Sequence, residues 1–362
     1  MHITHLSLQD FRSYKVLELP LKTKQSIFIG ENGEGKTNII EAIMYLSLLS
    51  SHRVSQDVPL IKLGAEQAYI RAKVLQDDRT QLIELEINSN KANRAKVNQN
   101  PVRSQKEILG ITQAIAFSPE DLDLVRGDPN ERRAFVDQLL IQRNPRISGV
   151  ITDYERALKQ RNALLKIRAS IQTLEPWDEH LTKFGSELVA SRIELIKALQ
   201  PYFINAYKNL AEKKPAGIAY KSNIENLSNN RELNQKLLKT KLLEVRDQER
   251  ERGITLAGPH RDDVLLSLGD HQVKGYASHG ESWSIALALR LASFQLLKEE
   301  GNRPILILDD VFSELDEARR EKLVQLAEEA EQTFITVAVE NDLPKNLNGV
   351  RYLVKSGTVK KL

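Results

Sequence analysis

Hydrophobic and polar residues nearly alternate along the N-terminal third of the chain. Alternation with a period of two puts successive side chains on opposite faces of a β-strand, so this third is expected to consist of strands and turns. A single helical pattern interrupts it, from Lys36 to about Leu49, with Ile39, Ile40 and Ile43 on one face. The predicted strands are Ile3 to Leu8, Ser26 to Ile29, Ala68 to Leu75 and Gln81 to Ile87.

From Pro119 onward the apolar positions recur at helical spacing. Asp128, Pro129 and Glu131 suit the N-cap, N1 and N3 positions of a helix start. Strand patterns return at Gly253 and alternate with helices to the last residue. At 1.5 Å per residue, the long helices of the middle segment would be rods of roughly 30–35 Å. These helices are predicted over Ile147 to Ala169, Trp177 to Leu199 and Glu232 to Arg250.

This order of patterns predicts an α/β fold made from both ends of the chain. Residues 1–118 and 251–362 are expected to form one discontinuous α/β domain. Residues 119–250 are expected to form an α-helical arm inserted into it.

Composition narrows the class of protein. The chain has 362 residues, of which 41% are hydrophobic and 28% charged, as in an ordinary globular protein. Its longest apolar runs are too short to cross a bilayer, and the N-terminus alternates like a strand instead of carrying a signal peptide. The absence of cysteine excludes disulfides and thiolate metal sites and fits a reducing compartment. We therefore expect a cytoplasmic protein; the net charge of +3 only mildly favours a polyanionic partner.

The stretch "FIGENGEGKTNIIEAI", residues 28–43, carries the pattern G-x-x-x-x-G-K-[ST] between a predicted strand and a predicted helix. In this motif the loop N–H groups point at the β-phosphate, Lys36 reaches the β- and γ-phosphates, and Thr37 binds Mg²⁺. The alternative is a glycine-rich turn that matches by accident. The predicted nucleotide-binding residues are Gly30, Glu31, Asn32, Gly33, Glu34, Gly35, Lys36, Thr37 and Asn38.

A second acidic motif, "RPILILDDVFSELDE", supplies candidate carboxylates. The apolar run Ile305 to Leu308 is typical of a parallel strand covered on both faces. Ligands bind at the carboxyl ends of such strands, so Asp309 and Asp310 are expected near the phosphates, on a strand that neighbours the P-loop strand. Asp309 is the candidate Mg²⁺ holder, with Thr37, and Asp310 the candidate for orienting the attacking water, with Lys36 as the third catalytic candidate. The alternative is an exposed acidic turn.

The long separation between Lys36 and Asp309 is typical of ABC-type ATPase heads. Such heads carry a signature helix about 30 residues before the acidic pair, and Ser278-His279-Gly280-Glu281 precedes an apolar helix that ends near Gly301. In this class Ser278 and Gly280 would face the γ-phosphate bound by a second subunit, so that two ATP molecules hold a twofold dimer together. Ser313 to Asp316 would be the D-loop at the same interface. The alternative is a plain core helix with a serine N-cap.

Taken together, the motifs resemble those of the RecF family, over essentially the whole chain. The resemblance rests on the P-loop, on "LQDFRSY" (Leu8 to Tyr14), "FSPEDLDLVRGDPNERRAFVD" (Phe117 to Asp137), "YERALKQRNALLK" (Tyr154 to Lys166), "AGPHRDD" (Ala257 to Asp263) and "LDDVFSELD". It implies a P-loop ABC-type ATPase head related to SMC proteins, and a weak, DNA-stimulated ATPase that dimerises on ATP. It also implies a clamp on gapped DNA that acts with RecR, and in many bacteria RecO, to promote RecA loading and SOS induction. By the same resemblance, Arg12 is expected to approach the γ-phosphate. Phe11 and Tyr14, which flank it, are interpreted as core residues.

Two departures from related heads bear on turnover. Glu281 stands where many relatives have glutamine, which would repel the nucleotide unless its carboxylate is protonated, turned away or paired with a base. No histidine follows the predicted strand Thr333 to Val339, although ABC transporters carry one there. Slow hydrolysis is therefore expected. The alternative functions are a transporter ATPase subunit and an SMC-like DNA tether; the inserted arm argues against the first, and its short length without sustained heptads against the second.

Two basic segments are candidates for DNA contact. The window Lys91 to Lys106 has five basic residues and no acidic one, and Arg94, Lys96 and Arg103 are its proposed phosphate ligands. The segment Arg156 to Arg168 would form a basic stripe if helical. For both, an ordinary solvated surface is the alternative. His260 and Arg261, beside two aspartates, are interpreted as a salt-bridged structural corner near the nucleotide, with contact to DNA or to the partner subunit left open.

Overall fold

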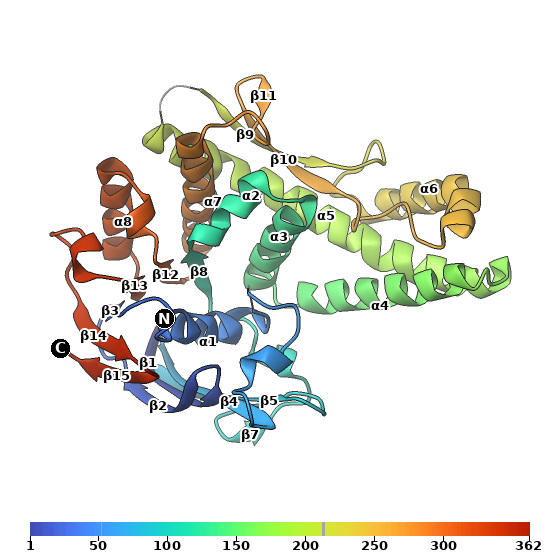
Figure 1. Cartoon of the computed structure of the whole chain (residues 1–362). Helices are drawn as coiled ribbons and strands as arrows, with labels where there is room; N and C mark the ends of the chain where they lie inside the picture. Colours follow the sequence, from blue (N-terminus) through green and yellow to red (C-terminus); the bar gives the residue numbers. More distant parts are fainter. Residues whose placement is uncertain (52, 212–213) are drawn as a thin grey trace. The chain divides into compact units, whose positions relative to one another are not determined.

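The computed structural model describes residues 1–51, 53–211 and 214–362 and divides the chain into two compact units. The first unit joins Met1–Leu122 to Trp283–Leu362, and the second is Asp123–Ser282. The second unit extends beyond the predicted arm boundary at residue 250, because the strand after that point pairs with a strand of the arm. Figure 1 shows both chain ends in the first unit.

The first unit contains an antiparallel six-stranded sheet in the order β2-β1-β4-β5-β6-β7. Strands β4 and β5 mostly alternate between buried and more exposed side chains, which is the pattern that the sequence predicted, whereas β1 is buried or half-buried throughout. The strands are β1 (His2–Phe11), β2 (Tyr14–Pro20), β4 (Gln67–Gln76), β5 (Arg79–Asn88), β6 (Arg94–Val97) and β7 (Asn100–Pro101).

A second six-stranded sheet of the same unit, in the order β15-β14-β3-β13-β12-β8, is parallel except for its antiparallel edge strand β15. Its three central strands β3, β13 and β12 are buried along their whole length, as expected of parallel strands that are covered on both faces. The strands are β3 (Gln25–Ile29), β8 (Ala114–Phe117), β12 (Ile305–Asp309), β13 (Thr333–Val337), β14 (Val350–Lys355) and β15 (Thr358–Lys361).

Helix α1 (Lys36–Leu48) belongs to the hydrophobic core that both sheets share. Eleven of its 13 residues are buried, so it lacks the single apolar face that the sequence predicted. A helix packed from two sides needs apolar residues around most of its circumference, and it leaves the P-loop that precedes it on a rigid base. The other helices of this unit are α8 (Glu317–Glu329) and most of α7 (His279–Glu299), and α2 (Leu122–Arg126) starts at its boundary.

The second unit consists of helices with one small antiparallel sheet in the order β11-β10-β9. Strand β9 interrupts the predicted helical insertion and pairs with β10, which follows it by about forty residues. The elements are α3 (Pro129–Arg143), α4 (Ile147–Lys166), α5 (Ile171–Leu210), β9 (Ala216–Lys221), α6 (Arg231–Arg252), β10 (Asp263–Leu268) and β11 (His271–Gln272).

Helix α5 is much longer than predicted. The sequence placed its ends at Trp177 and Leu199, next to Pro176 and Pro201, but the helix continues through both prolines to 40 residues, about 60 Å. Each proline removes one backbone hydrogen bond. Buried side chains on both sides of the two prolines, such as Leu174 and Phe203, keep the helix packed and outweigh that loss.

Candidate nucleotide-binding site

The loop between β3 and α1 has the backbone of a phosphate cradle. Gly33 and Gly35 adopt φ of 89° and 112°, in the left-handed region that glycine enters without strain. A Cβ on Gly35 would also lie 2.9 Å from both the Ser13 Oγ and the Tyr14 Oη atoms. Helix α1 begins directly after Gly35, so its N-terminal N–H groups face the same space.

Lys36 is buried, with its ammonium group turned back onto the loop. Its Nζ donates to the carbonyl oxygens of Gly30 (2.7 Å) and Glu31 (3.2 Å) and lies 3.8 Å from Oδ2 of Asp310. Buried charges persist in proteins only when they are paired or hydrogen-bonded, and this arrangement meets that condition. The side chain is therefore held at the loop by backbone carbonyl oxygens.

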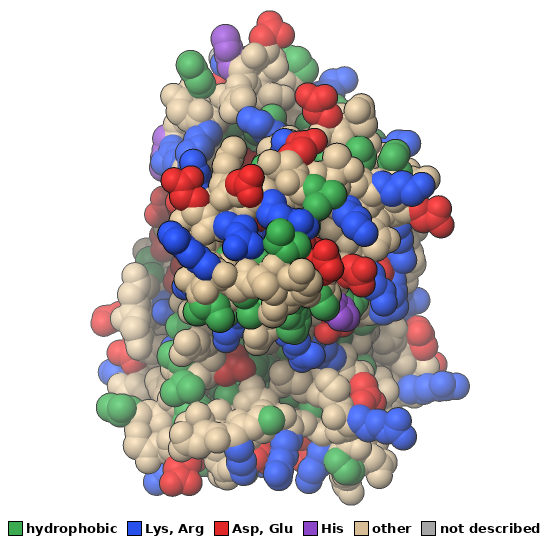
Figure 2. Space-filling view, turned by 90° about the vertical axis from the view of Figure 1, so that its right-hand side faces the viewer, with side chains coloured by type: hydrophobic (Ala, Val, Ile, Leu, Met, Phe, Trp, Pro, Cys, Tyr) green, Lys and Arg blue, Asp and Glu red, His purple; other side chains and the backbone are tan. Residues whose placement is uncertain are grey.

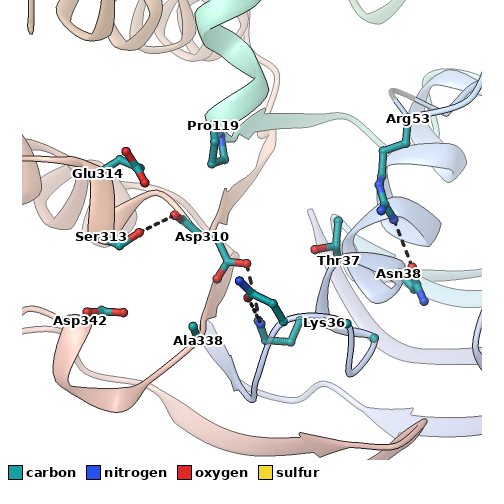
Figure 3. A pocket seen from close by; sticks show the side chains of 13 residues that line it. Lys36, Thr37, Asn38, Arg53, Pro119, Asp310, Ser313, Glu314, Ala338 and Asp342 are labelled. Carbon is teal, nitrogen blue, oxygen red and sulfur yellow. Dashed lines mark hydrogen bonds and ion pairs between the residues drawn. The ribbon is translucent and has the colours of Figure 1, made fainter. Parts of the chain in front are cut away.

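A cavity of about 460 Å³ opens over this loop, and every residue that lines it belongs to the first unit (Figure 3). Six of the predicted nucleotide-binding residues line the cavity together with Asp310 and with Ser313 and Glu314 of the predicted D-loop. The lining residues are Asn32, Gly33, Gly35, Lys36, Thr37, Asn38, Arg53, Pro119, Asp310, Ser313, Glu314, Ala338 and Asp342.

Asp309 and Asp310 lie at the carboxyl end of β12, as predicted, but not on the neighbouring strand of β3. Strand β13 lies between β3 and β12, because strand order depends on contacts that a single apolar run does not encode. Oδ1 of Asp309 is nevertheless 3.5 Å from the Thr37 hydroxyl, and Asp310 lines the cavity. Thus the P-loop and the acidic motif meet at one edge of the sheet.

The geometry at Thr37 and Asp309 fits a magnesium ion. Mg²⁺ commonly takes one or two protein oxygens and completes its shell with water and phosphate. Burial, together with the charges of Asp310 and Glu120, raises the pKa of the Asp309 carboxyl to about 6. A bound cation would favour its ionised form. Within the described ranges no cluster of three or more His, Cys, Asp or Glu side chains is placed to hold a metal by itself, so phosphate oxygens would have to complete the shell.

Six predicted nucleotide ligands lie outside the cavity lining: Ser278 and Gly280 in the second unit, and four residues of the first unit. Gly30 packs against β14, where a Cβ would come within 2.2 Å of the Val354 carbonyl oxygen. The carboxylate of Glu34 accepts the Ser356 N–H, and Glu31 offers its carbonyl to Lys36. The Arg12 guanidinium donates to both carboxylate oxygens of buried Glu41, at 2.7 and 2.6 Å. Their contact with nucleotide stays a prediction.

Several cavity residues were not found from the sequence. Arg53 follows α1 in a polar loop, and its guanidinium donates to Asn38 Oδ1 at 3.3 Å beside the phosphate cradle (Figure 3). Pro119 follows β8, and Ala338 and Asp342 follow β13, where a transporter would have its histidine. A lone arginine or aspartate in a loop carries no pattern, and only the parallel order of the strands shows that these loops share an edge.

The signature segment belongs to the second unit, and its carboxylate is held by neighbours in the same unit. Ser278 and Glu281 form a reciprocal pair: the Ser278 N–H donates to Oε2 of Glu281 at 2.8 Å, and the Glu281 N–H donates to Oγ of Ser278 at 3.3 Å. Lys214 binds the other carboxylate oxygen at 2.9 Å. The bonds from Lys214 and Ser278 lower the pKa of Glu281 to about 2. Glu281 is therefore paired with a base, which is one of the arrangements expected to prevent its repulsion of a nucleotide. Ser278 is exposed.

The predicted DNA ligands Arg94, Lys96 and Arg103 are exposed and line a groove of about 880 Å³ on the antiparallel sheet. The register places Glu86 opposite Arg94 and Glu84 opposite Lys96, so strand β5 supplies acidic neighbours that the basic window itself lacks. Figure 2 shows the same mixture on the face that it presents, with Lys and Arg interspersed among Asp and Glu. DNA contact at this groove stays a prediction.

The second basic segment is not a continuous stripe. Arg161 is fully buried in α4, where it binds Asp178 and Glu249, so it takes no part in a surface stripe. Arg156 and Lys159 remain exposed. The sequence could not separate these arginines because helical spacing alone does not say which face meets a neighbouring helix.

His260, in the segment Ala257 to Asp263, occupies a tight corner of the second unit. The Tyr154 hydroxyl is 2.6 Å from Nδ1 of His260, and Nε2 is 3.2 Å from the Thr255 carbonyl oxygen. A neutral ring with its proton on Nε2 satisfies both contacts. Burial and the charge of Arg261 lower the pKa of His260 to about 4.

This lowered pKa predicts acid destabilisation of the second unit. The unfolded chain takes up a proton near pH 6.5 that the folded ring refuses until about pH 4, so the free energy of unfolding falls as the pH falls through that window. The expected loss is about 2 kcal/mol between pH 7.5 and pH 5. Urea unfolding at both pH values measures it. His260→Gln should remove this part of the loss, whereas the control His180→Gln, at an exposed histidine, should keep it. An equal fall in the free energy of unfolding between the two pH values for both variants would contradict the argument.

None of the helices formed by the described residues combines the length and apolarity that a bilayer crossing requires.

Known proteins resemble this chain over its whole length. Residues 2–359 match the family model described as the RecF/RecN/SMC N terminal domain. The DNA replication and repair protein RecF of Streptomyces avermitilis is 52% identical, with 100% of both chains covered.

Two solved structures share the whole fold. They are described as the recombination mediator protein RecF-ATPrS and RecF-ATP in the RecFOR pathway, and each is 28% identical to this chain. Their TM-scores are 0.92 and 0.89; 100% of this chain is covered in each case, with 98% and 99% of the other chain.

Proposed function

Because the chain belongs to the RecF family, we propose that it is an ATP-dependent DNA-binding protein of recombinational repair, which uses the nucleotide as a clasp between two copies of itself. The observation that carries the proposal is the convergence of Lys36, Thr37 and Asp310 on one cavity, with Asp309 buried beside Thr37. It is supported by the likeness to a solved RecF-ATP structure.

The residues of the cavity would divide the work on ATP. The loop N–H groups and Lys36 would hold the phosphates, since both are preorganised donors at the start of a helix. Thr37 and Asp309 would hold Mg²⁺, which supplies charge neutralisation on the phosphates when bound. Asp310, at the cavity wall beside Lys36, would orient the attacking water. An aspartate there and the lack of a following histidine support a weak ATPase, stimulated by DNA and used as a switch.

The signature segment would complete the site of a second copy. Ser278 is exposed and Gly280 half-buried at the start of α7, a helix of 21 residues whose N–H groups suit an anion. Since Glu281 is held by Lys214 and Ser278, its charge is compensated within its own chain. Ser313 and Glu314, which line the cavity, would lie at the same interface.

The ATP-bound dimer would clamp gapped DNA, both single- and double-stranded, without reading its sequence, and hydrolysis would reset it. We further propose that it acts in the cytoplasm with RecR, and with RecO where present, to promote RecA loading and SOS induction. Phosphate contacts of this kind depend strongly on salt. RecA assembly on gapped DNA, followed with and without RecR and RecO, tests the partnership.

The clasp is tested by measuring association state and gapped-DNA binding without nucleotide, with ATP and with ADP. Wild type should dimerise and gain DNA affinity only with ATP. Lys36→Met should bind ATP about 100-fold more weakly, because two charge-assisted hydrogen bonds of about 1.5 kcal/mol each are lost, and should do neither.

The matched control is Lys15→Met, which removes an exposed lysine of β2 and should behave like wild type. Oligomers that form equally without nucleotide, or the absence of DNA affinity at low salt, would overturn the proposed function.

A further inference from the structure

Thr336, on β13, touches both acidic residues of the site and is fully buried. Its hydroxyl donates to Oδ1 of Asp309 at 2.5 Å. The Oγ1 atom of Thr336 also accepts the Asp310 N–H at 2.9 Å. One hydroxyl therefore joins the side chain of the first aspartate to the backbone of the second.

The bond from Thr336 restricts the orientation of the Asp309 carboxylate. Oδ1 of Asp309 lies between two hydroxyls, that of Thr336 at 2.5 Å and that of Thr37 at 3.5 Å. A carboxylate that is held by an outer partner keeps the orientation a metal requires, and loss of such a partner typically weakens metal binding. The Thr336 hydroxyl is the outer partner in this arrangement.

The bond to Asp310 supports an uncommon backbone conformation. Asp310 has φ of 52°, in the left-handed region that residues with a side chain seldom enter. Its N–H donates to the carbonyl oxygen of Thr336 at 3.2 Å as well as to the hydroxyl. This turn sends the backbone out of β12 so that the side chain of Asp310 lines the cavity.

We propose that Thr336 is a positioning residue of the nucleotide site, whose hydroxyl orients Asp309 for Mg²⁺ and anchors the turn that aims Asp310 at the cavity. The inference rests on the proposed nucleotide function and assigns a role to a residue that carries no sequence motif. It acts through the two aspartates and does not itself contact the ligand.

The same strand contains a matched threonine without this role. Thr333 is also fully buried, and its hydroxyl donates to the carbonyl oxygen of Ala327 at 3.2 Å, a contact with the backbone before β13. Thr→Val at either position removes one buried hydroxyl and conserves the side-chain shape. Only the change at Thr336 removes a partner of the acidic pair.

The test is the binding of ATP, titrated with Mg²⁺ and repeated in EDTA, for Thr336→Val, Thr336→Ser and Thr333→Val. Thr336→Val should bind ATP in EDTA within about twofold of wild type, because the P-loop is intact, and should need about 10- to 100-fold more Mg²⁺ for half-maximal enhancement. Thr336→Ser keeps the hydroxyl and should need the same Mg²⁺ concentration as wild type. Thr333→Val should also need the wild-type concentration, even if its melting temperature falls as much as that of Thr336→Val.

A double-mutant cycle separates positioning from a general loss of packing. In an Asp309→Ala background, Thr336→Val should have no further effect on the Mg²⁺ titration, because the carboxylate that Thr336 orients for the metal is gone. A Thr336→Val titration like that of wild type, or an equal shift in Thr333→Val, would overturn the inference while the proposed function stands. If wild type itself binds no ATP with Mg²⁺, both fail.

Discussion

Replacing Ser278 with arginine is expected to abolish ATP-dependent dimers while ATP binding to the monomer stays within about twofold of wild type. Ser278 is exposed at the N-terminus of α7, whereas the cavity that would bind ATP is lined by residues of the other unit. In the proposed dimer this serine meets the γ-phosphate of the partner, and a long side chain there would keep the two surfaces apart. Sedimentation with ATP should show dimer affinity reduced more than 100-fold, or about 3 kcal/mol.

A second exposed serine provides the control. Ser170 is the N-cap of α5 in the same unit, and its side chain accepts the Thr173 N–H. Arginine at either position costs about 1 kcal/mol of helix capping, so both variants should lose similar stability. Only Ser278→Arg should lose association. Dimers of Ser278→Arg at wild-type affinity would show that the signature segment does not face a second nucleotide.

The parts of the site that the sequence predicted are those in which chemistry is local. The P-loop needs glycines, a lysine and a threonine within eight residues, and its strand and helix flank it directly. Likewise, Asp309 and Asp310 follow a fully apolar run, which is enough to place them at a strand end. Such motifs can be recognised in a sequence because residues close along the chain determine their conformation.

The rest of the site depends on contacts between distant segments. Arg53 reaches the cavity from the loop after α1, and Thr336 meets Asp309 only because β13 lies beside β12. The acidic neighbours of the basic window also could not be predicted, because strand register places Glu84 and Glu86 opposite it. Pro176 shows the converse, a strong local signal for a helix end that packing overrides. Local patterns therefore predicted where the P-loop and the acidic pair lie, but neither the residues that support them nor their electrostatic surroundings.

Replacing Arg161 with alanine should destabilise the second unit by about 3–5 kcal/mol. Its guanidinium is fully buried and donates to Asp178 and Glu249, each at 2.6 Å, and to Thr255 at 2.9 Å, which ties α4 to α5, α6 and the loop after α6. Burial disfavours the cation, but the bonds to Glu249 and Asp178 outweigh this and raise the pKa of Arg161. Removal would leave Glu249 buried without its counter-charge, which is the costly case for an internal ion pair. Urea unfolding measures the loss.

Arg146 is the matched control, since it also pairs with a carboxylate on α5. Its partner Glu187 keeps a second cation, Arg231 at 3.2 Å, and the Arg146 side chain is 60% exposed, so Arg146→Ala should cost less than about 1 kcal/mol. If the unpaired charge of Glu249 is the source of the Arg161→Ala defect, adding Glu249→Gln should recover part of the loss, because a neutral amide is easier to bury than a carboxylate. An additive further loss would instead assign the defect to packing. The buried arginine would then hold the arm together by its shape, and its charge would be incidental.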